Sequence, residues 1–225
     1  GGMGAGPGAT PPLSIAEGEG VKLQSYLKAA NLEQLRAMPA DRILAPRIPD
    51  GPKVGVNVDG YLLKQTPEAA FANGAQNDVP LILGFAHDES FGGFGEVHGL
   101  DDYRAKAATR FGDQAAAFLE LYPANSDIEA VTQARAADRD STMAAGMAQW
   151  AEAQLAHGHS RVFTYQFDHP HSYAPNVKIT DLDPATAGSY HTSEVPFWLG
   201  TLDSFNKYRT TRAWTSADRA LSLMM

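Results

Sequence analysis

Two short apolar segments, residues 80–85 (PLILGF) and 161–167 (RVFTYQF), limit what this chain can fold into more than any other feature. The first has the length and composition typical of a fully buried strand, and the second is also a good strand candidate. Roughly 70 residues of mainly helical pattern separate them, and a crossover connection of this kind is what two parallel strands require. The sequence therefore predicts an α/β fold with a mostly parallel sheet covered by helices.

The predicted helices follow from capping residues and apolar spacing. Helices are expected over 14–30, where Gly18 and Gly20 weaken the pattern, and after Asn31, which forms a capping box with Gln34. Further helices are expected over 101–110, over 113–122, from Ser126 to a stop at Gly158, and from Thr215 or Ser216 onward. Residues 54–63 (VGVNVDGYLL) alternate around Asp59-Gly60, which predicts a small hairpin before the first strand.

Composition excludes several classes of function. The formal net charge is −8 and no basic stripe is present, which argues against a nucleic-acid partner. The longest apolar run has about seven residues, far fewer than the ~20 that cross a bilayer, so a soluble protein is expected. The chain has no cysteine, which removes disulfides, a thiolate nucleophile and thiolate metal sites. Both chain ends look cut, because GGMGAGPGATPP does not resemble a signal peptide and the last helical pattern is still running at Met225.

Two adjacent carboxylates, Asp88 and Glu89, follow the first predicted strand. In parallel α/β sheets functional groups gather on the loops outside the carboxyl ends of the strands, because helices cover both faces. A solvated turn or a helix cap would explain the same pair. Spacing alone does not rank the two residues.

A loop histidine, His191, lies about 100 residues further on, within GSYHTSEVPFWLG (188–200). It precedes a predicted short helix that Thr192 or Ser193 could cap. A surface or hydrogen-bonded histidine is the plain alternative. The order of a carboxylate at a strand end and then a loop histidine nevertheless matches the Ser, Asp or Glu, His order of the α/β-hydrolase triad.

The segments DVPLILGFAHDES and GSYHTSEVPFWLG, with VNVDGYLL upstream and TSADRALSLMM downstream, resemble the C-terminal half of type B carboxylesterases, the family of para-nitrobenzyl esterases and cholinesterase-like enzymes. The resemblance implies an α/β-hydrolase fold, with residues 1–225 as the C-terminal part of a single domain. It assigns Glu89 as the triad acid, although Ser90 replaces the usual glycine, and His191 as the triad histidine. It places Glu194 in the polar support behind His191, in the pattern His191, Glu194, Phe197.

The chemistry implied is carboxylic ester hydrolysis through an acyl-enzyme, with no cofactor. His191 would accept a proton from a serine hydroxyl, and Glu89 would fix the imidazole tautomer. No G-x-S-x-G motif occurs in the 225 residues, so the serine and oxyanion donors are expected in an N-terminal half of the enzyme outside this sequence. That half and a small-molecule ester are the expected partners. A non-catalytic α/β-hydrolase-fold module that binds proteins is the alternative, and the absence of cysteine favours a bacterial-type member by resemblance.

The remaining motifs are weaker. His157 with His159 and His169 with His171 form two H-x-H pairs, a loose signal for a metal because Asp168 is the only nearby carboxylate in the sequence. The aromatic residues Phe91, Phe94 and Trp198 flank the predicted acid and base, and they fit either a substrate pocket or the core. Helical spacing assigns Met143, Met147 and Trp150 to a buried helix face.

Overall fold

A computed structural model describes residues 10–44, 55–89 and 93–225. The chain divides into two compact units, Met3–Asn77 and Asp78–Met225. The assignment of all 225 residues to a single domain stays a prediction, because two compact units can belong to one domain. No helix in the described ranges is long and apolar enough to cross a membrane.

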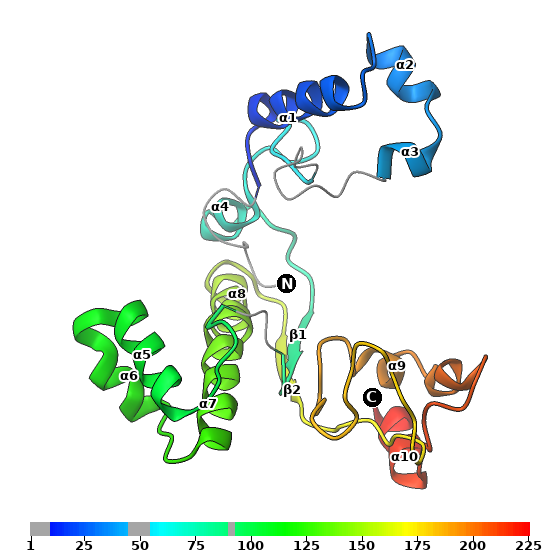
Figure 1. The fold of residues 1–225 in the computed structure, drawn as a ribbon. Coiled ribbons are helices and arrows are strands. Elements are labelled where there is room, and N and C mark those ends of the chain that lie inside the picture. The colour runs from blue at the N-terminus through cyan, green and yellow to red at the C-terminus, as the bar shows by residue number, and fades with distance from the viewer. Residues whose placement is uncertain (1–9, 45–54, 90–92) are drawn as a thin grey trace. The chain divides into compact units, whose positions relative to one another are not determined.

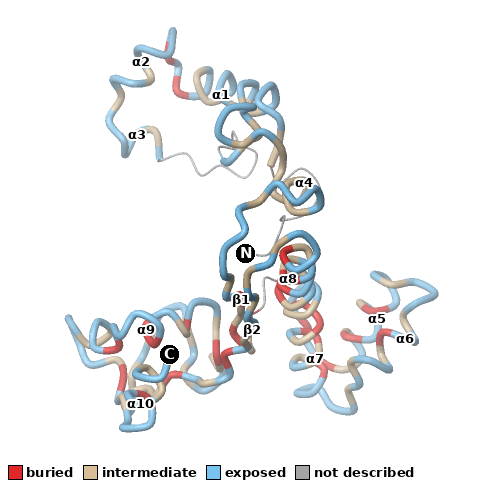
Figure 2. The backbone as a smooth tube through the Cα atoms, turned by 180° about the vertical axis from the view of Figure 1, so that it is seen from behind, coloured by how far each residue is buried: buried red, intermediate tan, exposed pale blue. Residues whose placement is uncertain are grey.

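The first unit contains four helices in its described residues: α1 (Leu13–Tyr26), α2 (Leu32–Ala37), α3 (Ala40–Leu44) and α4 (Pro67–Ala72). Asn31 caps α2 through the Gln34 amide at 2.9 Å, but the Gln34 side chain reaches the amide of Ala30 rather than completing a capping box. None of the residues in these helices is buried, and Figure 2 shows them mostly exposed or intermediate.

The predicted hairpin does not form in the described residues 55–63. Val58 instead makes a parallel bridge to Pro12, and the Leu13 amide donates to the Val58 carbonyl at 3.0 Å. Asp59 and Gly60 do form a turn, in which the Asp59 carboxylate accepts from the amides of Tyr61 and Leu63. The turn at Asp59-Gly60 is therefore as predicted. The backbone partner of Val58, however, comes from a distant segment, which local alternation does not reveal.

The second unit is built on two parallel strands, β1 (Leu81–Ala86) and β2 (Val162–Phe167), paired from Leu81↔Val162 to Ala86↔Phe167. The predicted crossover is confirmed. It consists of α5 (Leu100–Phe111), η1 (Gly112–Gln114), α6 (Ala115–Leu121), α7 (Asp127–Arg139), the π-helical turn η2 (Asp140–Ala144) and α8 (Ala145–His157). Beyond β2 come α9 (Val195–Trp198), η3 (Leu202–Asn206) and α10 (Ser216–Met224).

One face of the strand pair is covered. Figure 1 shows α8 running beside β1 and β2. Met147 and Ala151 of α8, with Met143 of the preceding turn η2, pack against Leu83. The helix that was predicted to run unbroken to His157 is interrupted by the π-helical turn, and Gly158 ends it as expected. The register partners Ile82 and Phe163 are 59% and 52% exposed, so the residues that the structure describes leave part of the sheet surface uncovered.

Two further clusters fix the segments around the strand ends. One cluster joins α5, α6 and α7 and includes Phe94, Tyr103 and Phe118. Phe94 therefore belongs to the core, while Phe91 lies outside the described residues. Phe167 at the end of β2 packs against Phe197 and Leu202. The second cluster holds the segment that follows His191 against the carboxyl end of the sheet.

Candidate active site

The acidic pair lies at the carboxyl end of β1. The His87 amide donates to the Phe167 carbonyl at 2.8 Å and so extends the ladder one step beyond β1. The chain then turns, and the Glu89 amide donates to the Ala86 carbonyl at 3.3 Å. Glu89 is only 2% exposed, so the strand end carries a carboxylate into the interior.

The histidine lies on a tight turn, Tyr190 to Ser193. The Ser193 amide donates to the Tyr190 carbonyl at 2.9 Å, and Thr192 has a positive φ of 70°. This is unusual for a β-branched residue. The predicted cap was wrong, because α9 begins after Glu194 without a side-chain cap. The backbone turn itself, with the Val195 amide on the Thr192 carbonyl at 3.1 Å, starts the helix instead.

The fold brings Glu89 and His191 together across 102 positions of sequence. The Nδ1 atom of His191 lies 2.9 Å from Glu89 Oε1. A carboxylate can only accept, so Nδ1 carries the proton in this pair. The carboxylate is buried, while the imidazole side chain is 54% exposed. A buried carboxylate thus accepts a hydrogen bond from one nitrogen of an exposed ring. This is the arrangement in which a carboxylate orients a general base.

Asp88 is used differently from its neighbour. Its Oδ2 atom accepts from the Ser189 amide at 2.7 Å, and its own amide donates to the Ser189 carbonyl at 2.9 Å. Gly188, with φ of 54°, lies so close that a Cβ there would be 2.1 Å from Asp88 Oδ2. Asp88 therefore fastens the loop before His191 to the strand end, a role that the sequence did not distinguish from that of Glu89.

Glu194 lies at the start of α9, where its carbonyl accepts from the Phe197 amide at 3.0 Å. Burial raises the pKa of the nearby Tyr165, and the charges of Glu194 and Glu89 raise it further. The support role assigned to Glu194 stays a prediction. Four buried side-chain oxygens in these segments have no hydrogen-bond partner among the described residues: Glu89 Oε2, Ser189 Oγ, Ser193 Oγ and Glu194 Oε2.

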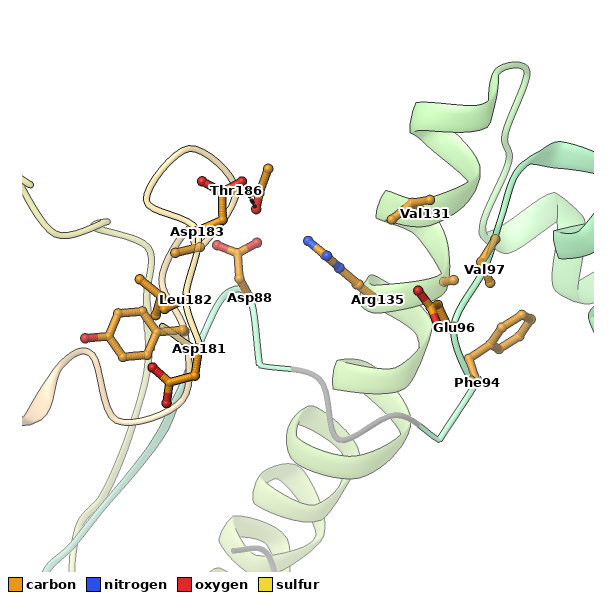
Figure 3. Close-up of a pocket in the computed structure, with 14 residues that line it drawn as sticks. Asp88, Phe94, Glu96, Val97, Val131, Arg135, Asp181, Leu182, Asp183 and Thr186 are labelled. Atoms are coloured by element: carbon orange, nitrogen blue, oxygen red, sulfur yellow. Dashed lines mark hydrogen bonds between the residues drawn. The ribbon is translucent and has the colours of Figure 1, made fainter. Parts of the chain in front are cut away.

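A cavity of about 670 Å³ borders Asp88 and Tyr190. Figure 3 shows Asp88 on one side of it, beside Asp183 and Thr186, and Arg135 of α7 projecting from the other side. Its lining is mixed in charge and polarity. Asp88 and Tyr190, which line the cavity, are the sequence neighbours of the candidate triad residues Glu89 and His191.

The two H-x-H pairs do not converge on a metal site. His169 contacts Asp218, and His171 contacts the Ser193 carbonyl. In the part of the chain that the structure describes, no group of three or more His, Cys, Asp or Glu side chains could hold a metal ion. Sequence reasoning missed both of these histidine contacts, and the only signal was the pair motif itself.

The fold and the convergence at the end of β1 define an α/β-hydrolase type of protein. The chain matches the model of the carboxylesterase family over residues 16–225 and belongs to that family. The predicted relationship and the predicted fold are confirmed.

The chain is similar to Fumonisin B1 esterase of Sphingopyxis macrogoltabida, with 31% identity over 205 residues, 87% of this chain and 36% of that protein. It also resembles a solved PNB esterase at a TM-score of 0.57 and 21% identity, covering 95% of this chain and 44% of the esterase. EstA of Aspergillus niger gives a TM-score of 0.54 at 17% identity, covering 92% and 42%. These structural likenesses show the fold, and the chain spans less than half the length of these relatives.

Proposed function

We propose that this chain is the part of a serine carboxylesterase that supplies the triad acid and histidine, Glu89 and His191. The observation that carries the proposal is the 2.9 Å contact between His191 Nδ1 and a carboxylate that is 2% exposed. With Nδ1 facing Glu89, the opposite nitrogen, Nε2, is the one that would take the proton from a serine hydroxyl and later return it to the leaving alcohol.

The serine and the oxyanion donors come, in this proposal, from the rest of the enzyme. The 225 residues contain no G-x-S-x-G motif, and the chain covers 36% of its esterase relative. Two observations support a missing neighbour: four buried oxygens around the site have no partner in the described part of the chain, and the register partners Ile82 and Phe163 are exposed there. Buried polar atoms without partners are costly, so the remaining half would both complete the site and cover the sheet.

The chemistry then follows from charge placement. Proton transfer from serine leaves a positive imidazolium on His191, and the adjacent Glu89 carboxylate stabilises that charge inside a buried environment where electrostatic interactions are strong. The serine oxygen attacks the ester carbonyl, the alcohol leaves with the proton from His191, and water repeats the sequence to release the acid. No cofactor enters these steps.

Labelling of the complete enzyme with a fluorophosphonate probe tests the proposal. We expect covalent labelling of one serine, loss of labelling in His191→Gln, and hydrolysis of p-nitrophenyl esters; fumonisin B1 belongs in the substrate panel because of the relative's activity. The isolated 225-residue chain should not be labelled. A complete enzyme that is folded yet neither labelled nor active would favour the non-catalytic binding module instead.

A further inference from the structure

A buried network lies behind the turn that carries His191, and the proposed mechanism does not use it. It joins His171, Arg212 and Tyr190, with the rings of Tyr173 and Phe205 around them. His171 and Arg212 are each 4% exposed. Burying a histidine beside an arginine is unfavourable unless the hydrogen bonds are complete, so these contacts call for a physical reason.

The contacts of His171 define one tautomer. Its Nε2 atom lies 2.8 Å from the Ser193 carbonyl, which can only accept, so Nε2 carries the proton. Its Nδ1 atom then accepts from Arg212 Nε at 3.0 Å. Burial lowers the pKa of His171 to about 4; the hydrogen bond to Ser193 opposes this shift and the Arg212 charge adds to it. The ring is therefore neutral near pH 7 and donates in a fixed direction.

Arg212 is itself held rigidly. Its guanidinium carbon lies 4.3 Å from the centroid of the Tyr173 ring and 4.7 Å from that of Phe205, a cation–π sandwich. The Asn206 side chain accepts from the Arg212 amide at 2.9 Å and donates to its carbonyl at 2.9 Å. The arginine thus donates to the His171 nitrogen opposite the one that contacts the Ser193 carbonyl.

The turn needs such an external support. Thr192 has φ of 70°, a conformation that persists in a β-branched residue only when the surroundings impose it. This turn carries His191, whose side chain is 54% exposed. His171 contacts both ends of the turn, through the Ser193 carbonyl and through the Tyr190 hydroxyl, which lies 3.1 Å from Nδ1.

We propose that His171 is a positioning residue for the esterase reaction: its Nε2–H bond to the Ser193 carbonyl holds the Tyr190–Ser193 turn so that His191 faces Glu89. This inference rests on the proposed function. His171 acts through the backbone of the turn and touches no reacting atom, so its loss should reduce kcat and leave substrate binding nearly intact.

A matched pair of substitutions in the complete enzyme separates the two nitrogens of the ring. The amide of His171→Gln can place an N–H near the position of Nε2, whereas the amide of His171→Asn reaches only the Nδ1 side. We expect kcat of the Asn variant to fall about 10- to 100-fold with KM changed less than about twofold. The Gln variant should stay within about threefold of wild type, and fluorophosphonate labelling rates should follow kcat.

The control is His157→Asn, at the exposed end of α8, which should leave kcat unchanged. Equal kcat values for the Asn and Gln variants would overturn the proposal, whether both are active or both impaired. If the Asn variant does not fold by circular dichroism, His171→Met, which fills similar space without a donor, takes its place in the comparison. An inactive, unlabelled wild type would instead refute the proposed function, so the two failures are distinguishable.

Discussion

Two of the imidazole–carboxylate pairs near the carboxyl end of the sheet have a fully buried carboxylate, and they differ in how that carboxylate is satisfied. In one, His191 Nδ1 lies 2.9 Å from Glu89; in the other, His169 Nε2 lies 2.6 Å from Asp218. Both carboxylates are buried, and both imidazole side chains are partly exposed, at 54% and 37%. Exposure and distance therefore do not tell the pairs apart.

Asp218 is saturated with donors. Its Oδ2 accepts from Ser172 Oγ at 2.8 Å, from the Thr215 amide at 2.6 Å and from Thr215 Oγ1 at 2.8 Å, while Oδ1 faces His169. Burial alone would raise the pKa of Asp218, but the hydrogen bonds from His169, Thr215 and Ser172 outweigh it and hold the pKa at about 2. This carboxylate fixes the start of α10 to the loop after β2.

Glu89 has one oxygen on His191 and one buried oxygen without a partner among the described residues. Asp218 is thus satisfied by donors of this chain, whereas the second Glu89 oxygen is left for a partner in the proposed remaining half of the enzyme. The comparison indicates that the number of competing donors, rather than the presence of a His–carboxylate contact, separates the catalytic candidate from the structural pair.

The largest expected effect is a loss of kcat, and it is tested by comparing Glu89→Gln with Asp218→Asn in the complete enzyme. Glu89→Gln should lower kcat by about 10³- to 10⁴-fold, because the amide stabilises neither the correct tautomer nor the imidazolium. Asp218→Asn should keep kcat within about threefold, because the cost of this substitution falls on stability. Steady-state kinetics with a p-nitrophenyl ester gives both values. Similar losses in the two variants would show that the pairs are not functionally distinct.

The sequence contained enough to predict the fold and to select the pair, for different reasons. The strand segments carry their own signal, since PLILGF and RVFTYQF need burial on both faces, and the structure has β1 and β2 within a residue of the expected bounds. Glu89 was separated from Asp88 only by resemblance. In the structure the distinction depends on where the Gly188–Ser189 segment docks, a tertiary contact with no local signature.

The parts that were missed all depend on long-range partners. Residues 55–63 alternate like a hairpin, yet Val58 pairs with Pro12, because strand pairing is chosen by the whole fold and not by local alternation. His169 and His171 are adjacent in motif, but one contacts Asp218 and the other Ser193. The start of the last helix at Thr215 was predicted, but the sequence gave no sign that Asp218, which completes the cap, also contacts a histidine.

The next largest effect tests the contact between Asp88 and the Gly188–Ser189 segment, which sets the geometry of the Glu89–His191 pair. Gly188→Ala places a Cβ 2.1 Å from Asp88 Oδ2 at a φ of 54°, so the loop before His191 must shift. A displacement of about 1 Å costs roughly 100-fold in rate, and we expect a fall in kcat of that order. Gly112→Ala is the matched control, with φ of 52° and nothing within 4 Å of the added atom. Its φ is similar, so equal losses of kcat in both variants would argue against docking.

A smaller effect concerns the stability of the Asp218 pair. Asp218→Asn replaces one carboxylate oxygen with an NH₂ group, which cannot accept, so at least one of the buried donors around Asp218 loses its acceptor. We expect a loss of about 2 kcal/mol in the free energy of unfolding, measured by urea denaturation. Asp203→Asn, which breaks an exposed pair with Arg219, should cost clearly less, because solvent screens exposed pairs. Equal costs would contradict the view that Asp218 is the saturated, structural carboxylate.

The smallest effect is the acid dependence that the same carboxylate confers. The pKa of Asp218 is depressed to about 2 in the folded protein from 3.8, so its contribution is present above pH 3.8 and is lost as the pH falls toward 2. Between pH 5 and pH 3 this loss amounts to about 1 kcal/mol. Urea midpoints at the two pH values should therefore differ more for wild type than for Asp218→Asn, which has no proton to bind at this position. An identical pH dependence in the two proteins would mean that the donors around Asp218 do not hold it ionised, and the contrast with Glu89 would then lose its electrostatic basis.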